Sequence, residues 1–121
     1  MLKLKSISSS QVNLKSWHPP NEEVFVCLDM EIGFFDIRQG TNLFYVNLAT
    51  PGALHEYHND PVLVENRTIV ISEYNYDLVK RTILEILKKC SRDDWNESYQ
   101  VLLRYFQWEY EDYNKIYPLT S

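Results

Sequence analysis

Three stretches of the chain alternate hydrophobic and polar residues, which is the pattern of β-strands with one buried face. In residues 2–8 leucine alternates with lysine, and such lysines are typical of an edge strand that resists unwanted pairing. In residues 23–33 every even-numbered position is apolar, so we expect this face to lie in the core. Residues 43–49 alternate in the same way after a turn at 40–42, which predicts an antiparallel pair with residues 23–33.

A short helix and a further strand are predicted next. Thr50 suits the N-cap and Pro51 the first helical position, because the threonine hydroxyl accepts a hydrogen bond from a free amide and proline has no amide proton. The Asp60-Pro61 pair should end this helix. Residues 68–73 then alternate again and predict another strand.

Two longer helices follow, and each is marked by apolar residues three or four positions apart. Asn75 is a suitable N-cap for the first, whose apolar stripe consists of Val79, Ile83, Ile86, Leu87 and Cys90. A capping-box pattern from Ser91 to Asp94 predicts the start of the second, with apolar positions at Trp95, Tyr99, Leu102 and Phe106. After Phe106, the alternation of aromatic and acidic residues favours a last strand at 108–113.

Together these elements predict an α+β fold. The loop between the two longer helices is short, so they should lie antiparallel to each other. We expect an antiparallel β-sheet of about four to five strands with two antiparallel helices packed on one face. A chain of 121 residues with 45% hydrophobic residues suits a single domain, residues 1–121.

The charge balance of the chain bears on its partners. Twelve Lys and Arg residues stand against 17 Asp and Glu, which gives a net charge of -5. No run of basic residues is longer than two, so nucleic acid is not expected as a partner and a basic protein is favoured. The cysteines Cys27 and Cys90 show no CxxC spacing, which argues against a disulfide framework or a structural zinc site. With no signal-peptide pattern or membrane-spanning stretch either, we expect a cytoplasmic protein that does not enter the membrane.

Few residues show a pattern that is typical of catalysis. His55, His58 and Asp60 have an approximate metal-ligand spacing, but a fourth ligand is missing nearby, and a pair of surface histidines explains them more simply. Asp29 and Glu31 share the polar face of one strand, where a solvated surface is favoured over an acid/base pair. The three glycines are too far apart to form a phosphate-binding loop. The sequence thus predicts neither a catalytic centre nor a cofactor.

The run from Trp108 to Tyr113 interleaves aromatic rings with carboxylates, a composition that is common in protein interfaces. Trp108 and Tyr110 could equally be core residues that close the sheet. We therefore take an acidic and aromatic surface as the candidate partner-binding site, and its predicted members are Asp29, Glu31, Tyr45, Glu109, Tyr110, Glu111 and Asp112.

Several blocks of the sequence, in their order, resemble the immunity protein 8 family of bacterial polymorphic toxin systems. They are LKLKSISS at the start, NLFYVNLATP after the long strand, ISEYNYDLVKRTI leading into a helix, and WEYEDY near the end. The resemblance implies an α+β protein that is encoded beside a toxin and neutralises the toxin's C-terminal domain by binding it, as in contact-dependent growth inhibition. It implies no catalytic residues.

Three hypotheses for function follow from these observations. The leading one is a cytoplasmic immunity protein, not an enzyme, that binds a cognate toxin domain, which we expect to be basic and nuclease-like. The second is a small metal-dependent hydrolase that uses His55, His58 and Asp60 together with Glu56. The third is a non-catalytic ligand-binding module, which requires a sizeable apolar pocket.

Overall fold

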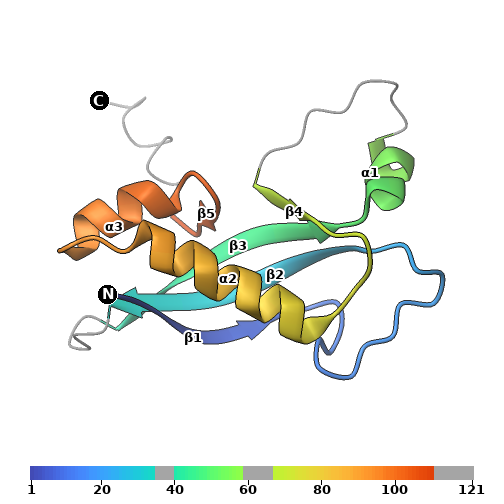
Figure 1. Ribbon diagram of the computed structural model, residues 1–121, viewed down its shortest axis with the longest axis horizontal. Helices are drawn as coiled ribbons and strands as arrows, with labels where there is room; N and C mark the ends of the chain where they lie inside the picture. The colour runs from blue at the N-terminus through green and yellow to red at the C-terminus, as the bar shows by residue number, and fades with distance from the viewer. Residues whose placement is uncertain (35–39, 59–66, 111–121) are drawn as a thin grey trace.

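The computed structural model describes residues 1–34, 40–58 and 67–110 (Figure 1). Their elements, in chain order, are β1 (Leu2–Ser8), β2 (Phe25–Phe34), β3 (Thr41–Ala49), α1 (Pro51–His58), β4 (Thr68–Val70), α2 (Tyr76–Cys90), α3 (Trp95–Leu102) and β5 (Gln107–Trp108). The strands form one sheet in the order β1-β2-β3-β4, and β5 also pairs with β3. Helices α2 and α3 lie on the same face and run in roughly opposite directions (Figure 1). The predicted α+β fold is confirmed.

The sheet is mostly antiparallel, and its one parallel pair among the described strands departs from the prediction. β1 with β2, β2 with β3, and β3 with β5 are antiparallel, whereas β4 runs parallel to β3. The segment after β3 leaves the sheet through α1 before β4 begins, and a crossover of this kind brings a strand back in the same direction. β4 also ends at Val70, three residues before the predicted end of the strand.

The core lies between the even-numbered face of β2 and the helices. Val24, Leu28, Met30 and Ile32 are fully buried and Val26 nearly so, as their alternation predicts. They pack against the buried positions of β3, α2 and α3, which are Phe44, Val46, Leu48, Val79, Ile83, Leu87, Cys90 and Leu102. The predicted stripe of α2 is therefore buried, except that Ile86 is only half-buried at its border.

The caps of two helices are confirmed, and one prediction is wrong. The Thr50 hydroxyl accepts from the Ala53 amide at the start of α1, and the Asn75 side chain accepts from the Leu78 amide in α2. In α3 the N-cap is Asp94 and not Ser91, since the Asp94 carboxylate accepts from the Glu97 amide at 2.8 Å. Ser91 instead ends α2, and its hydroxyl accepts from the Leu2 amide at the start of β1.

The predicted C-terminal strand is shorter than expected. Pairing with β3 covers Gln107 and Trp108, after which Glu109 and Tyr110 form a turn. The Glu109 carboxylate accepts from the Leu43 amide at 3.3 Å and so takes the place of a backbone acceptor. Residues 111–113, the rest of the predicted strand, lie outside the described residues.

Candidate functional site

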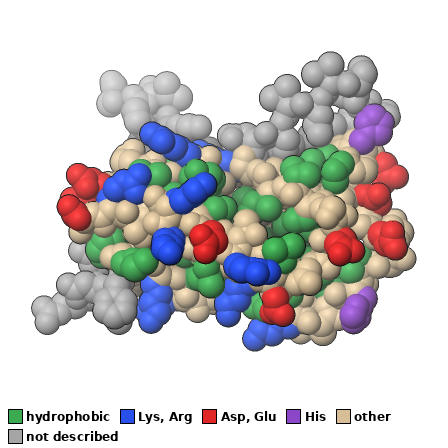
Figure 2. Space-filling view, in the orientation of Figure 1, with side chains coloured by type: hydrophobic (Ala, Val, Ile, Leu, Met, Phe, Trp, Pro, Cys, Tyr) green, Lys and Arg blue, Asp and Glu red, His purple; other side chains and the backbone are tan. Residues whose placement is uncertain are grey.

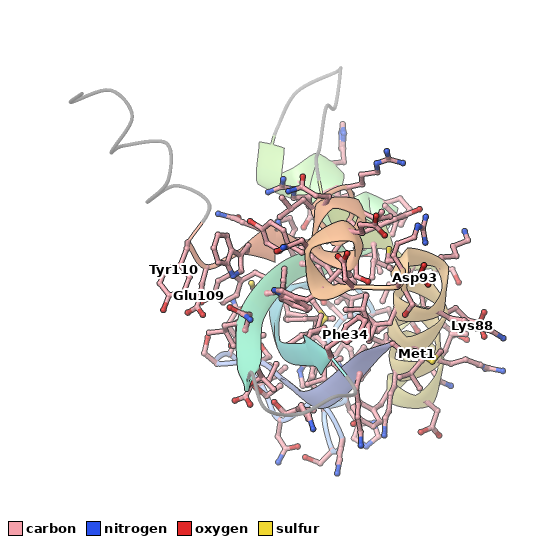
Figure 3. The ribbon with its side chains drawn as sticks, turned by 90° about the vertical axis from the view of Figure 1, so that its left-hand side faces the viewer. Met1, Phe34, Lys88, Asp93, Glu109 and Tyr110 are labelled. Carbon is pink, nitrogen blue, oxygen red and sulfur yellow. The ribbon has the colours of Figure 1, made fainter. Side chains whose placement is uncertain are left out.

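The face of the sheet opposite α2 and α3 carries the odd-numbered residues of β2 and β3. Directly paired residues of neighbouring strands share a face, so the register defines the members of this surface. We call it the open face, and its described members include Lys3, Ser6, Ser8, Phe25, Cys27, Asp29, Glu31, Leu43, Tyr45, Asn47, Gln107 and Glu109. In Figure 3, Glu109 and Tyr110 lie on the side of the strands away from α2, whereas Lys88 and Asp93 lie on the helix side.

Tyr45 lies at the centre of the open face, with acidic residues on both sides. Asp29 of β2 is its direct partner, and Gln107 of β5 pairs with it from the other side. Paired side chains in a sheet have Cβ atoms about 4.5–5.5 Å apart. Burial raises the pKa of the Tyr45 phenol, and the charges of Glu109 and Asp29 raise it further. Both carboxylates are therefore close enough to Tyr45 to act on its hydroxyl.

Cys27 lies beside Asp29 on the same strand, and its thiol is poorly suited to nucleophilic chemistry. Burial raises the pKa of Cys27, and the Asp29 carboxylate raises it further, so the thiol stays protonated at neutral pH. Its amide donates to the Gln11 side-chain oxygen at 2.8 Å, which extends the hydrogen bonding of β2 beyond the end of β1. This environment suits an unreactive thiol.

Two further carboxylates on the open face are held in place. Glu31 is exposed and accepts from the Thr41 hydroxyl on the neighbouring strand. Glu109 is bound to Leu43 twice, through its own amide, which donates to the Leu43 carbonyl at 3.1 Å, and through its carboxylate. Lys3 pairs with Gly33 and so lies on the same face beyond Glu31. The centre of the open face is thus acidic, with a basic side chain at one end.

An aromatic cluster adjoins this surface at β5. Trp108 packs edge-on against Tyr99 and Tyr110, with ring centroids 4.9 and 5.1 Å apart, and its indole donates to Asn42. Trp108 is half-buried at the core, whereas Tyr110 is 47% exposed. The sequence left open whether these rings belong to an interface or to the core. Trp108 is therefore better described as a core residue, and Tyr110 offers an exposed ring at the margin of the open face.

The structure brings most of the predicted site residues together. Asp29, Glu31, Tyr45 and Glu109 share the open face, and Tyr110 lies at its margin. Glu111 and Asp112 lie outside the described residues. The prediction missed several neutral members of the surface, namely Leu43, Asn47 and Gln107. Leu43 and Asn47 alternate with buried residues of β3, so the strand pattern alone could have assigned them.

The opposite surface of the protein has a different charge. Lys and Arg side chains gather over the helix layer, with a few carboxylates among them (Figure 2). Helix α2 contributes four exposed basic residues to this surface, which are Lys80, Arg81, Lys88 and Lys89. The acidic open face and the more basic helix layer are therefore separated by the thickness of the core.

The hypothesis of a metal-dependent hydrolase gains no support from the described residues. Within residues 1–34, 40–58 and 67–110, no three His, Cys, Asp or Glu side chains converge on a position that could hold a metal ion. His55 is exposed on α1, while the side chain of His58 and the whole of Asp60 lie outside the description. That metal site stays a prediction. Among the described helices, none is long and apolar enough to cross a membrane.

Comparison with known proteins agrees with this arrangement of elements. The sequence matches the family model described as immunity protein 8 over residues 2–113, nearly the whole chain. No curated protein and no solved structure matches it. Because the match extends from β1 past β5 and includes every described strand and helix, the chain belongs to the immunity protein 8 family.

Proposed function

We propose that this immunity protein neutralises its cognate toxin by binding the toxin's C-terminal domain through the open face. The proposal rests above all on one observation. Residues that are far apart in the sequence, Asp29, Tyr45 and Glu109, lie together on the sheet face that α2 and α3 leave uncovered. An immunity protein acts through its partner, and this surface offers both charge and aromatic area to a partner.

The charges on the open face favour a basic toxin domain. Asp29, Glu31 and Glu109 carry formal negative charges around the Tyr45 ring, and the chain as a whole carries a net charge of -5. Such a field speeds the encounter with a positively charged partner and fixes its orientation. A nuclease fits this description, since it needs a cationic cleft for its substrate. An acidic surface over that cleft would exclude the nucleic acid.

The size of the open face sets a limit on this contact. β2 has 10 residues, so the face is about 33 Å long, and four strands about 4.8 Å apart make it roughly 15–19 Å wide. Its flat footprint is thus on the order of 500 Å², which is small beside the roughly 800 Å² of accessible surface that each partner buries in a stable interface. A nanomolar complex, at about 12 kcal/mol, therefore needs contacts beyond the flat sheet, and exposed Tyr110 supplies one at its margin.

The test compares two variants with the same change in net charge. The double variant Asp29→Lys with Glu109→Lys reverses the centre of the open face, and the control, Glu85→Lys with Asp93→Lys, changes exposed positions near or on α2. Each is measured for its association rate with the toxin domain encoded beside the gene and for protection of cells that express that domain. We expect at least a tenfold slower association for the open-face variant and little change for the control.

Two results would contradict the proposal. Equal effects of both double variants would show that only net charge matters, and an unchanged association rate for the open-face variant would place the toxin elsewhere. Failure of the unaltered protein to protect cells or to form a complex with the toxin domain would remove the function itself. Circular dichroism of each variant separates these outcomes from unfolding.

A further inference from the structure

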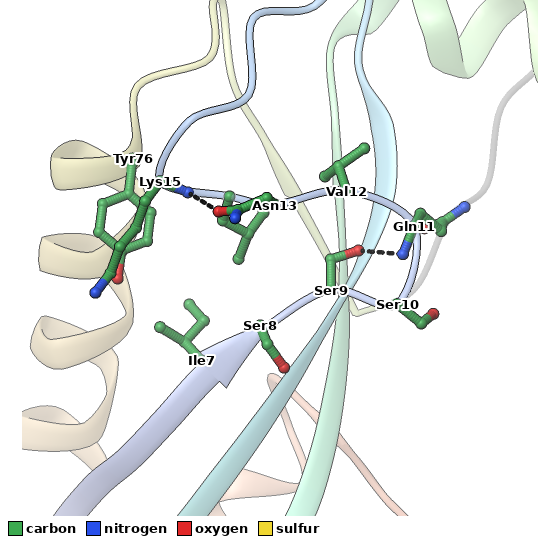
Figure 4. Close-up of a pocket in the computed structure, with 10 residues that line it drawn as sticks. Ile7, Ser8, Ser9, Ser10, Gln11, Val12, Asn13, Lys15 and Tyr76 are labelled. Atoms are coloured by element: carbon green, nitrogen blue, oxygen red, sulfur yellow. Dashed lines mark hydrogen bonds between the residues drawn. The ribbon is translucent and has the colours of Figure 1, made fainter.

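A recessed surface lies along β1, next to the open face, with which it shares Ser6 and Ser8. One open hollow of about 520 Å³ is bordered by the end of β1, residues 9–15 and Tyr76 at the start of α2 (Figure 4). A second hollow, about 280 Å³ in volume, continues along β1 as far as Leu4 and reaches Lys80. The two share Ile7, Lys15 and Tyr76, so they are adjacent parts of one surface region. We call it the edge groove, lined by residues 4–15, Tyr76 and Lys80.

The edge groove has the opposite charge to the chain as a whole. Lys5, Lys15 and Lys80 line it and are exposed, and its lining contains no Asp or Glu. The structure gives none of these three side chains an ion pair with another described residue. Net repulsion from a protein with a charge of -5 is screened over about 8 Å at physiological salt, whereas direct contacts with the lysines are not. The groove can therefore attract an anion at short range.

The position of the groove between an edge strand and a helix suits an extended chain. In the described sheet, β1 pairs with β2 on one side only, and its other side faces the groove next to α2. Peptides are commonly bound in extended form between the edge strand of a sheet and a neighbouring helix. The bulge between Leu4 and Ser6 and the lysines both protect this edge against ordinary strand pairing, and an acidic chain offsets the part of that protection that the lysines supply. The groove should therefore prefer an acidic extended chain to a neutral one.

We propose that the edge groove binds an extended acidic segment of the toxin partner. In this arrangement carboxylates of the segment contact Lys5, Lys15 and Lys80, and an apolar side chain between them packs on Ile7 and the Tyr76 ring. The stretch from Leu4 to Ser8 is about 16 Å long at roughly 3.3 Å a residue, which suits about five residues. The assignment of the occupant to the toxin rests on the proposed function, and this second contact extends an interface for which the open face alone is too small.

The first experiment measures binding of a peptide to the full chain without any toxin. The probe is a fluorescein-labelled octapeptide of alternating glutamate and valine, and its anisotropy is followed at low and at physiological salt. We expect saturable binding that weakens with salt and falls about five- to tenfold in each of Lys5→Glu, Lys15→Glu and Lys80→Glu. The control Lys88→Glu changes the same charge on the same helix about 12 Å farther along, beyond the screening length, and should alter binding less than twofold.

The outcomes of this experiment either support or overturn the proposal. Equal weakening by Lys88→Glu would reduce the effect to non-specific attraction, and equal binding of a lysine–valine octapeptide would remove the role of charge. Tighter binding of an oligouridylate of eight nucleotides than of the acidic peptide would assign the groove to nucleic acid instead. Because all the substituted lysines are exposed, the variants should fold, and their circular dichroism checks this.

The second experiment identifies the source of the acidic segment. With the toxin domain, Lys15→Glu and Lys80→Glu should speed dissociation of the complex by about tenfold, whereas Lys88→Glu should not. A toxin complex that is indifferent to the groove variants would overturn the assigned occupant. The open-face variant Asp29→Lys with Glu109→Lys should still bind the octapeptide, so failure of the groove and failure of the proposed function are told apart.

Discussion

The junction between β3 and α1 depends on one buried hydroxyl, and its removal gives a quantitative test of the fold. Thr50 is 3% exposed, and its amide donates to the Val24 carbonyl at 2.9 Å. Its side-chain oxygen accepts from the amides of Val24, at 3.1 Å, and of Ala53, at 3.3 Å, while the hydroxyl donates to the Glu23 carboxylate. Thr50→Val keeps the shape of the side chain and removes all three of these interactions.

The expected cost follows from the groups that lose their partners. The amide of Val24, a fully buried residue, is left without an acceptor, which costs about 1–3 kcal/mol. Loss of the N-cap of α1 costs about 1 kcal/mol more. We therefore expect a loss of about 2–4 kcal/mol, a large part of the roughly 5–15 kcal/mol that stabilises a domain of this kind. At about 4 °C per kcal/mol, Tm should fall by about 8–16 °C.

The assay is urea unfolding followed by circular dichroism, with Thr50→Ser as the matched control. Serine keeps the hydroxyl and loses one methyl group, which costs about 1 kcal/mol. Hydrogen exchange of the Val24 amide should quicken in the valine variant and stay slow in the serine variant. If the valine variant were as stable as the serine variant, the hydroxyl would not be what holds β2, β3 and α1 together, and the reasoning above would fail.

Two further predictions concern the ionisable groups of the open face. Glu109→Gln should lower the pKa of Tyr45 towards its usual value of about 10, because burial and then the Glu109 carboxylate raise that pKa. NMR titration of labelled tyrosine measures the shift. An unchanged titration midpoint would show that the Glu109 charge does not act on Tyr45. The contribution of the Tyr45 hydroxyl to the free energy of unfolding is complete at pH values below its pKa in the unfolded chain. It is lost as the pH rises through the higher pKa of the folded protein, since the folded state keeps the proton to a higher pH. Cys27 should be alkylated more slowly than free cysteine at pH 8, because burial and then the Asp29 charge raise the pKa of its thiol. Asp29→Asn should speed the alkylation. Equal alkylation rates in the unaltered protein and in this variant would contradict the role of Asp29.

The sequence predicted correctly those features of the fold that depend on residues close together in the chain. The even-numbered face of β2 is buried as its alternation requires, because a period of two places every second side chain on one side. Thr50 and Asn75 cap their helices because the free amides lie within three residues of the cap. The start of α3 was misplaced because Ser91 and Asp94 both suit an N-cap, and the contact of Ser91 with Leu2 lies 89 residues away in sequence.

The candidate site, too, was predictable from the sequence only where its residues lie on the same strand. Asp29 and Glu31 were predicted to share a face from the spacing within one strand. That Glu109 joins them depends on the pairing of β5 with β3, which links residues 66 positions apart. No local pattern encodes that register, since β5 has only two residues and its position is fixed by Trp108 packing on Tyr99 and α3. The parallel direction of β4 has a different cause, the crossover through α1, and the predicted helix between the two strands already carried that signal.

The net charge of this protein is an incomplete guide to its partner. The value of -5 favours a basic partner everywhere, yet the structure separates an acidic open face from a lysine-lined groove on the far side of β1. A partner that covers both surfaces must carry charges of both signs in the matching places, and a uniformly basic protein would be repelled at the groove. Under the two proposals, such a pattern would select one toxin among several of similar charge, because a mismatch at either surface leaves like charges opposed. Salt should therefore slow association with the correct toxin and, by screening the repulsion, reduce the discrimination against wrong ones.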